Sequence, residues 1–203
     1  MINFNDLVES GQLSTGTTTL AFKLKDAVIV ATESQATAGY LVATKHAQKL
    51  FKISDHSAAT ISGGVADCQY IVNNVQALAR LREVESGKEA PLKYIANIIR
   101  NILFQGRSYF LSMMLVVGYD EEPKIYGVDL IGSFFEEDEY LSFGSGSTYA
   151  LGVLEAGYKN DLSVDEGIDL AKRAISAARN RDIASGGDWQ IAVIDKDGYK
   201  KVE

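Results

Sequence analysis

The chain has 203 residues, which suits one domain built around one hydrophobic core. Hydrophobic residues make up 46% of it and charged residues 23%, so its composition excludes a disordered or fibrous protein. A net charge of −7 argues against a nucleic-acid partner, because nucleic acids bind basic surfaces. No segment reaches the roughly 18 consecutive apolar residues that a membrane span requires, so we expect no membrane partner.

The single cysteine, Cys68, rules out an internal disulfide framework and fits a reducing cytosol. We expect it to fill space in the core. Residues 1–16 have neither the basic start nor the apolar run of a secretory signal, so we expect a cytoplasmic protein. The two histidines, His46 and His56, stand among polar residues and are interpreted as surface side chains. They leave few members for a Ser-His-Asp or Cys-His site.

The first part of the chain has the pattern of antiparallel strands. Two hairpins are predicted, over residues 18–24 with 27–32 and over residues 49–53 with 58–62. The strand over 27–32 is almost wholly apolar, which is typical of a strand covered on both faces. A polar connection containing Gly39 joins the hairpins, and adjacent glycines at Gly63 and Gly64 end the second one.

Helices and strands then alternate in blocks. Apolar residues at helical spacing predict helices over 65–85, 91–104, 148–158 and 164–181. Alternating or apolar runs predict strands over 113–119, 124–131, 140–143 and 190–194, with a short last strand after Gly198. The acidic run from Glu136 to Glu139 is interpreted as a solvated turn, with a metal site as the alternative. A capping box from Ser163 to Glu166 opens the last helix. Blocks of this kind predict an α+β fold with helices outside and two sheets inside.

The junction between Gly16 and Thr17 suggests a chain that cuts itself before Thr17. A threonine at a new N-terminus carries both a hydroxyl nucleophile and an α-amine that can take its proton. The amine suits this role because its ordinary pKa is about 7.7 to 8.0. The alternative for the same stretch is a threonine-rich edge strand behind a disordered tail, since threonine favours strands.

A threonine nucleophile needs a nearby cation, carboxylates that hold the cation, and backbone N–H groups for the oxyanion. The chain offers Lys49 where a predicted strand starts, Glu33 where one ends, and Asp182 in the loop after a predicted helix. Gly63 ends an apolar strand, where a bare backbone N–H can face a bound carbonyl. Each charged residue taken alone is more often a surface charge.

Several motifs in one order resemble the catalytic beta subunit of the archaeal-type proteasome core particle, over residues 16–199. They are Thr17-Thr18-Thr19, Lys25 to Ile29, Ala31-Thr32-Glu33, Lys49-Leu50-Phe51, Gly144 to Ser147 and Arg181 to Gly187. The resemblance implies a four-layer αββα sandwich of the N-terminal-nucleophile hydrolase type. It also implies a propeptide over residues 1–16, cut between Gly16 and Thr17, and one catalytic domain over residues 17–203.

By the same resemblance Thr17 is the nucleophile and, through its α-amine, the base. Lys49 is the neighbouring cation and Glu33 its carboxylate partner, and the N–H of Gly63 forms the oxyanion hole. Supporting residues around the amine are Ser145, Asp182 and Ser185. The first specificity pocket is lined by Ala36, Thr37, Ala47, Ile61 and Val65, a mainly apolar set that implies cleavage after large apolar residues. No cofactor and no metal ion are implied.

The resemblance further implies a threonine endopeptidase that degrades unfolded polypeptides. Its partners would be other beta subunits in a seven-membered ring, two such rings stacked between rings of alpha subunits, and an ATP-dependent unfoldase cap. Two other functions stay open: a non-catalytic structural beta subunit of the same particle, and a small-molecule amidase on the same kind of fold. The sequence also departs from the family. Glu33 stands where aspartate is frequent, Gln35 where arginine is common and Ala66 where glycine is common.

Overall fold

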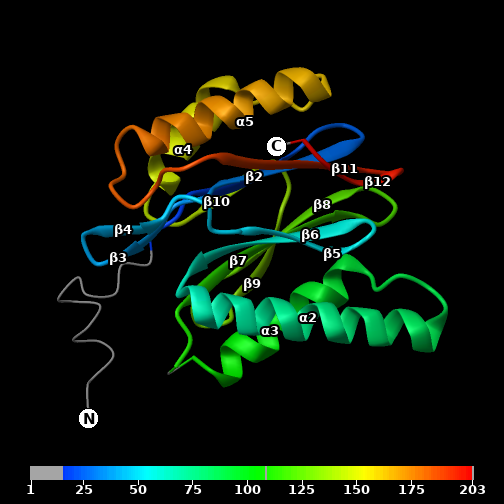
Figure 1. The fold of residues 1–203 in the computed structure, drawn as a ribbon. Coiled ribbons are helices and arrows are strands. Elements are labelled where there is room, and N and C mark those ends of the chain that lie inside the picture. Colours follow the sequence, from blue (N-terminus) through cyan, green and yellow to red (C-terminus); the bar gives the residue numbers. More distant parts are fainter. Residues whose placement is uncertain (1–15, 108, 203) are drawn as a thin grey trace, which may run out of the picture.

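The computed structural model describes residues 16–107 and 109–202. Four layers are stacked, with two five-stranded antiparallel sheets in the middle and a pair of helices on each outer face (Figure 1). This arrangement is the αββα sandwich that the sequence predicts. Within the described part of the chain, no helix combines the length and the apolar character needed to cross a membrane.

The upper sheet combines strands from both ends of the chain. In spatial order its strands are β10 (Tyr140–Phe143), β1 (Thr19–Lys23), β2 (Ala27–Glu33), β11 (Trp189–Asp195) and β12 (Gly198–Lys201). Strand β2 is buried at all seven positions, because sheet and helices cover its two faces. Pairing sets Thr19 of β1 and Gln190 of β11 opposite the same residue, Thr32 of β2.

The lower sheet is formed by consecutive strands. They are β5 (Leu50–Ser54), β6 (Ser57–Gly63), β7 (Ser112–Tyr119), β8 (Pro123–Val128) and β9 (Phe134–Glu137). The predicted hairpin of β5 and β6 is confirmed, as is that of β1 and β2. Strand β5 lies at one edge of this sheet and β9 at the other.

The helices bear out the predicted periodicity. They are α2 (Val65–Ser86), α3 (Leu92–Gln105), α4 (Ser147–Gly157) and α5 (Val164–Arg179). The first pair covers the lower sheet and the second pair the upper one (Figure 1). Helix α5 begins with the predicted capping box, in which Ser163 and Glu166 satisfy each other's backbone N–H groups. Pro91, placed in the first turn by the sequence pattern, is the N-cap of α3.

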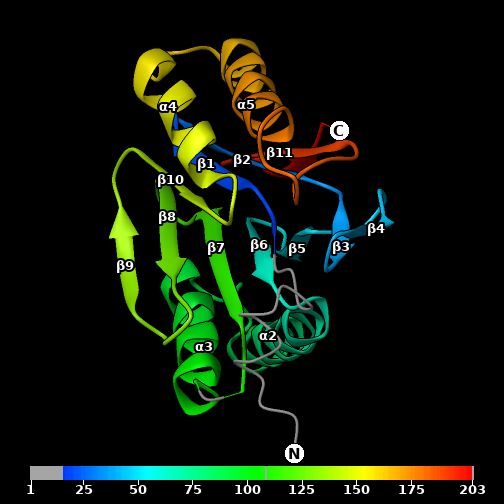
Figure 2. The ribbon, with the colours of Figure 1, turned by 90° about the vertical axis from the view of Figure 1, so that its left-hand side faces the viewer.

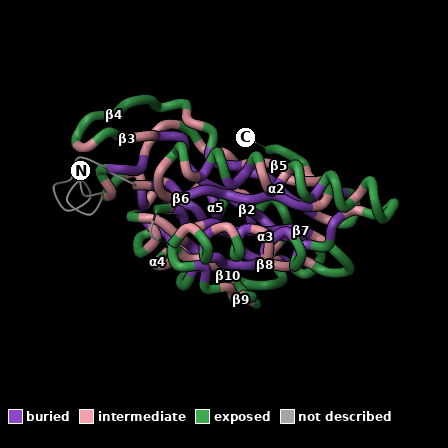
Figure 3. The backbone as a smooth tube through the Cα atoms, turned by 90° about the horizontal axis from the view of Figure 1, so that it is seen from below, coloured by how far each residue is buried: buried purple, intermediate pink, exposed green. Residues whose placement is uncertain are grey.

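Alternation along the strands builds the layers. In β1, Leu20 and Phe22 pack against the upper helices, while Ala21 between them faces the lower sheet. The same two-residue period puts Ile191 of β11 on the helix side and Ala192 between the sheets. Figure 3 shows the result, with buried backbone concentrated in the central strands. Cys68 is fully buried in the lower helix–sheet core, as expected for a core-filling thiol.

Three predictions of local structure were wrong. The supposed polar connection around Gly39 contains a hairpin, β3 (Ala36–Ala38) and β4 (Leu41–Thr44), which projects from the body of the molecule (Figure 2). The strand predicted over 124–131 ends at Val128. The acidic run is only partly a turn, because Glu136 and Glu137 end strand β9. Charges on such an edge strand discourage pairing with another chain. They also interrupt the apolar alternation by which a strand is predicted from sequence.

Candidate active site

The predicted site residues lie close together because, in an antiparallel hairpin, the start of the first strand and the end of the second strand lie at the same end of the sheet. Thr17 lies just before β1, and Glu33 is the last residue of β2. Lys49 lies just before β5, and Gly63 is the last residue of β6. The two hairpins therefore present all four residues at one end of the sandwich.

A buried ion pair lies beside the Thr17 hydroxyl. The Nζ of Lys49 donates a hydrogen bond to Thr17 Oγ1 over 3.1 Å, and it also contacts the Oε1 of Glu33 as an ion pair. Thr17 is 2% exposed, Lys49 3% and Glu33 0%. Burial lowers the pKa of Lys49, because desolvation penalises its charged form, and the carboxylate of Glu33 opposes this effect. The geometry therefore places a cation with a lowered pKa against a threonine hydroxyl.

The carboxylate of Glu33 is fixed on both oxygens. Its Oε2 accepts hydrogen bonds from the backbone N–H groups of Gln35, at 2.7 Å, and Gly186, at 3.0 Å. Its Oε1 accepts one from the N–H of Thr18 at 3.4 Å, besides contacting Lys49. Glu33, which stands where aspartate is frequent in the family, thus reaches the lysine with its longer side chain, and several backbone donors hold its carboxylate in a single orientation.

A second network surrounds Asp182. The Oδ2 of Asp182 accepts hydrogen bonds from the hydroxyls of Ser145 and Ser185, each over 2.6 Å. The hydroxyl of Ser185 is also hydrogen-bonded to that of Thr18 over 2.7 Å. The three residues that the resemblance groups around the amine are therefore joined in one network through Asp182. This network reaches the nucleophile position through Thr18, the next residue along the chain.

The Gly144 to Ser147 run is more than a turn between a strand and a helix. Gly144 has a φ of 99°, and a Cβ added there would lie 1.9 Å from the carbonyl oxygen of Thr17. Only glycine permits this conformation together with such a close approach. The N–H of Gly146, the N-cap of α4, donates to the same oxygen over 3.4 Å. Gly144 was not among the predicted site residues, although a Gly-x-Gly run between a strand and a helix is the signal that marks it.

Gly16 also occupies a position that no larger residue fits. A Cβ added to Gly16 would lie 1.7 Å from the Cβ of Ala184 and 3.2 Å from the Oγ of Ser145. The Thr17 hydroxyl donates a hydrogen bond over 2.6 Å to the carbonyl oxygen of Gly16. The nucleophile candidate thus lies beside the peptide bond at which the sequence predicts cleavage. Residues 1–15 of the predicted propeptide lie outside the described residues.

A small pocket opens next to Thr17 and Lys49. It is lined by Gly63 and by all the predicted specificity residues, Ala36, Thr37, Ala47, Ile61 and Val65. The wall also includes two polar residues, Gln35 and Gln48, that the sequence analysis did not assign to the pocket. The side chain of Gln35 donates a hydrogen bond to the carbonyl of Ile183 over 3.1 Å, so it ties the pocket to the loop that carries Asp182.

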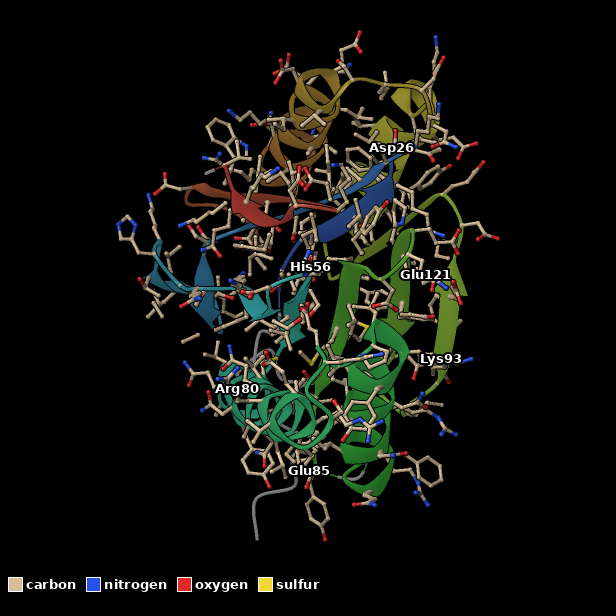
Figure 4. The ribbon with its side chains drawn as sticks, turned by 90° about the vertical axis from the view of Figure 1, so that its right-hand side faces the viewer. Asp26, His56, Arg80, Glu85, Lys93 and Glu121 are labelled. Carbon is tan, nitrogen blue, oxygen red and sulfur yellow. The ribbon has the colours of Figure 1, made fainter. Side chains whose placement is uncertain are left out.

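A larger cavity lies at the opposite end of the sandwich, where it is lined by the strand turns that contain His56 and Glu121, both labelled in Figure 4. His56 was predicted to be a surface histidine, and its side chain is 35% exposed, but the sequence did not reveal its partner. His56 is half-buried, and its Nδ1 lies 2.8 Å from the Oε2 of Glu89. This hydrogen bond raises the pKa of His56. The side chain of His46 is 81% exposed, as predicted.

The metal-site alternative for the acidic run finds no support. Among residues 16–107 and 109–202, no three His, Cys, Asp or Glu side chains group closely enough to hold a metal ion.

Comparison with known proteins shows which family the chain belongs to. The family model described as "Proteasome subunit" matches residues 13–194. A proteasome subunit beta of Methanocaldococcus jannaschii is 45% identical over 191 residues, which cover 93% of this chain and 85% of the relative. A proteasome subunit beta 1 of Caldivirga maquilingensis is 40% identical, covering 94% of this chain and 95% of the relative. One of Pyrobaculum arsenaticum is 43% identical, covering 92% and 94%. The chain therefore belongs to the proteasome subunit family and resembles its archaeal beta subunits.

Proposed function

We propose that this chain is a threonine endopeptidase subunit of a proteasome core particle, which hydrolyses unfolded polypeptides through an ester on Thr17. One observation carries the proposal. The Thr17 hydroxyl accepts a hydrogen bond from Lys49, whose ammonium is paired with the buried carboxylate of Glu33. A buried ion pair is costly to desolvate, so its position against a hydroxyl favours a chemical role over a purely structural one.

Peptide cleavage would proceed in two steps. The Oγ1 of Thr17 bonds to the carbonyl carbon of the substrate while the α-amine of the mature N-terminus takes the hydroxyl proton. The C–N bond then breaks, the leaving amine receives that proton, and an ester remains on Thr17. In the second step water attacks the ester carbon and gives a proton to the α-amine. The bond between that carbon and Oγ1 then breaks, the amine returns the proton to Oγ1, and a carboxylic acid leaves. Lys49 stabilises the developing negative charge throughout, and no cofactor takes part.

Removal of the proposed propeptide, residues 1–16, would use the same hydroxyl. The Oγ1 of Thr17 adds to the carbonyl carbon of Gly16, the C–N bond breaks, and the nitrogen of Thr17 takes the proton as it becomes an amine. Water then hydrolyses the ester between Gly16 and Thr17. The 2.6 Å hydrogen bond from the Thr17 hydroxyl to the Gly16 carbonyl supports this step. The catalytic domain would then span residues 17–203.

The remaining roles follow the same proposal. Asp182, Ser145 and Ser185 would orient the freed amine, and the N–H of Gly63 would bind the oxyanion. The pocket of Ala36, Thr37, Ala47, Ile61 and Val65 would accept large apolar side chains before the cut. By analogy with its family, the subunit would act in the cytoplasm. There it would join other beta subunits in a seven-membered ring stacked with alpha rings, fed by an ATP-dependent unfoldase.

The proposal is tested by peptide hydrolysis with the chain co-assembled with its alpha subunit. A short fluorogenic peptide with a large apolar residue before the cut serves as substrate. The native chain should cleave it, and Thr17→Ala should reduce the rate to background while particles still form. Cleavage by Thr17→Ala particles at the native rate would overturn the proposal, and inactive native particles would favour a structural subunit.

A further inference from the structure

We propose that Gln190 is a positioning residue of this site, whose side-chain amide holds the backbone from which both Lys49 and the pocket residue Ala47 project. The inference rests on the proposed function. Gln190 is the second residue of β11, and it belongs to neither the predicted catalytic set nor the pocket lining. It acts through other residues, because its amide binds the backbone behind the site rather than the Thr17 hydroxyl.

One amide makes three hydrogen bonds to one short segment. The Oε1 of Gln190 accepts from the backbone N–H of Lys49 over 2.9 Å and from that of Leu50 over 3.0 Å. Its Nε2 donates to the carbonyl of Ala47 over 2.7 Å. Both polar atoms of the amide are therefore hydrogen-bonded: the oxygen binds N–H groups that follow Gln48, and the nitrogen binds the carbonyl that precedes it. A single side chain thus binds the main chain at 47–50 at three points, in addition to the backbone hydrogen bonds of Ala47 with Ser34 and of Lys49 with Ile61.

This segment needs such a partner because it enters an edge strand. Among the described strands β5 pairs only with β6, so the backbone groups on its other side lack a neighbouring strand. Gln190 belongs to the other sheet. Alternation along β11 places it on the same face as Ala192 and Ile194, which pack between the sheets. The amide therefore joins the upper sheet to the edge of the lower one at the end that carries Thr17.

The start of β11 contacts the backbone of both partners of the buried ion pair. In the antiparallel pairing of β11 with β2, Trp189 lies opposite Glu33. The next residue, Gln190, binds the backbone of Lys49. Two successive residues thereby link the backbone that carries the carboxylate to the backbone that carries the ammonium. Loss of the amide would free Lys49 while leaving Glu33 in place, and the contact from Lys49 to Thr17 would become longer or more variable.

The two ends of the amide serve different parts of the site. Oε1 fixes the residue that carries the ammonium, whereas Nε2 fixes Ala47, a wall of the pocket. The substitution Gln190→Glu separates these two contributions, because a carboxylate can still accept from both N–H groups but has no donor for Ala47. Gln190→Met removes both at nearly constant volume. The matched control is Gln76→Ala, because the half-buried Gln76 donates to the carbonyl of Lys52, farther along the same strand, over 2.8 Å.

The experiment measures kcat, KM and their pH dependence for an apolar peptide on assembled particles of the native chain and these three variants. A displacement of about 1 Å costs about 100-fold in rate, so Gln190→Met should lower kcat about 10- to 100-fold and slow leader removal.

Gln190→Glu should keep kcat within about 3-fold and raise KM several-fold, because only Ala47 loses its partner. Its added negative charge near Lys49 should raise the pKa of that ammonium and shift the alkaline limb upward. Gln76→Ala should match the native chain.

Amide hydrogen exchange of the peptide containing residues 47–50 provides a readout independent of activity. Exchange should be faster in Gln190→Met than in the native chain and in Gln76→Ala. If native particles hydrolyse the peptide while Gln190→Met shows native kcat and native exchange, the inference is wrong. If native particles are inactive, the proposed function fails, and native exchange in Gln190→Met would still remove Gln190 as the residue that fixes this segment.

Discussion

The ammonium of Lys49 lies 3.1 Å from the hydroxyl oxygen of Thr17, and the same group is paired with the carboxylate of Glu33. Both charged side chains are almost completely buried. Burial favours the neutral form of a lysine, and the paired carboxylate favours the charged form. Their balance determines how much positive charge faces the hydroxyl, and the following predictions change one contribution at a time.

Replacement of Lys49 by alanine should give particles that assemble, keep residues 1–16 and cleave no peptide. The change removes the group that contacts Thr17 and leaves Glu33 buried without its partner. Breaking a buried ion pair in this way costs about 3 to 5 kcal/mol of unfolding free energy. Thermal melting and peptide hydrolysis check the two effects. Lys52→Ala is the control, since Lys52 is exposed and pairs with Asp55, and normal turnover by Lys49→Ala would remove Lys49 from the site.

The alkaline limb of the activity profile should depend on Glu33. Because the pKa of Lys49 is already lowered by burial, activity should fall at a lower pH than the ordinary lysine pKa would give, as the ammonium loses its proton. Glu33→Gln removes the charge that raises this pKa, so the limb should move to still lower pH. Measurement of the residual kcat/KM of Glu33→Gln across pH shows in which direction the alkaline limb moves. An unchanged or upward shift would contradict a cationic role for Lys49.

Gly144→Ala should abolish most activity, because the new Cβ would meet the carbonyl oxygen of Thr17 and the φ of 99° disfavours alanine. Displacement of Thr17 by about 1 Å predicts a loss in kcat of about 100-fold. The control is Gly152→Ala in helix α4, where an added Cβ meets nothing within 4 Å. That variant should remain active and gain about 0.5 to 1 kcal/mol of stability. Equal activities in the two variants would refute the close approach.

Gln35→Ala should lower kcat several-fold while changing the free energy of unfolding by only about 1 kcal/mol, the usual worth of one hydrogen bond. Its amide anchors the carbonyl of Ile183, next to Asp182 in the loop that also carries Ser185. Without this anchor the serine and aspartate network should be less well ordered around the amine. Asn97→Ala removes a comparable hydrogen bond, from an exposed amide to the carbonyl of Lys93, and should leave kcat unchanged. Native kcat in Gln35→Ala would show that the loop needs no such anchor.

The sequence predicts most helices and strands because apolar residues recur at helical spacing or at every second position wherever one face of the element is buried. Strand β2 and helix α5 are examples, one almost wholly apolar and the other opened by a capping box. The hairpin of β3 and β4 lacks this signal, because β4 is exposed at every position, including Leu41 at 74%. Strand β9 lacks it because its last two residues are glutamates.

Some residues of the candidate site have a local sequence signal, and others do not. Thr17 and Glu33 stand at the open end of one predicted hairpin, and Lys49 stands at the open end of the other. Hairpin pairing therefore explains each half of the site, whereas the packing of one sheet on the other brings Lys49 to Thr17 and Glu33. Gln190 has no such signal, since its role depends on how one sheet lies on the other, and no local pattern determines that packing. The partner of His56 was missed for a similar reason, because Glu89 comes from the distant connection between α2 and α3.

The most direct test of a self-processed threonine nucleophile is the intact mass of this chain after co-assembly with its alpha subunit, compared with that of Thr17→Ala. The native chain should lose residues 1–16 and begin at Thr17, whereas the variant should keep its full length. A native chain that retains residues 1–16 within assembled particles would contradict the account, and so would a Thr17→Ala chain cut at the same bond.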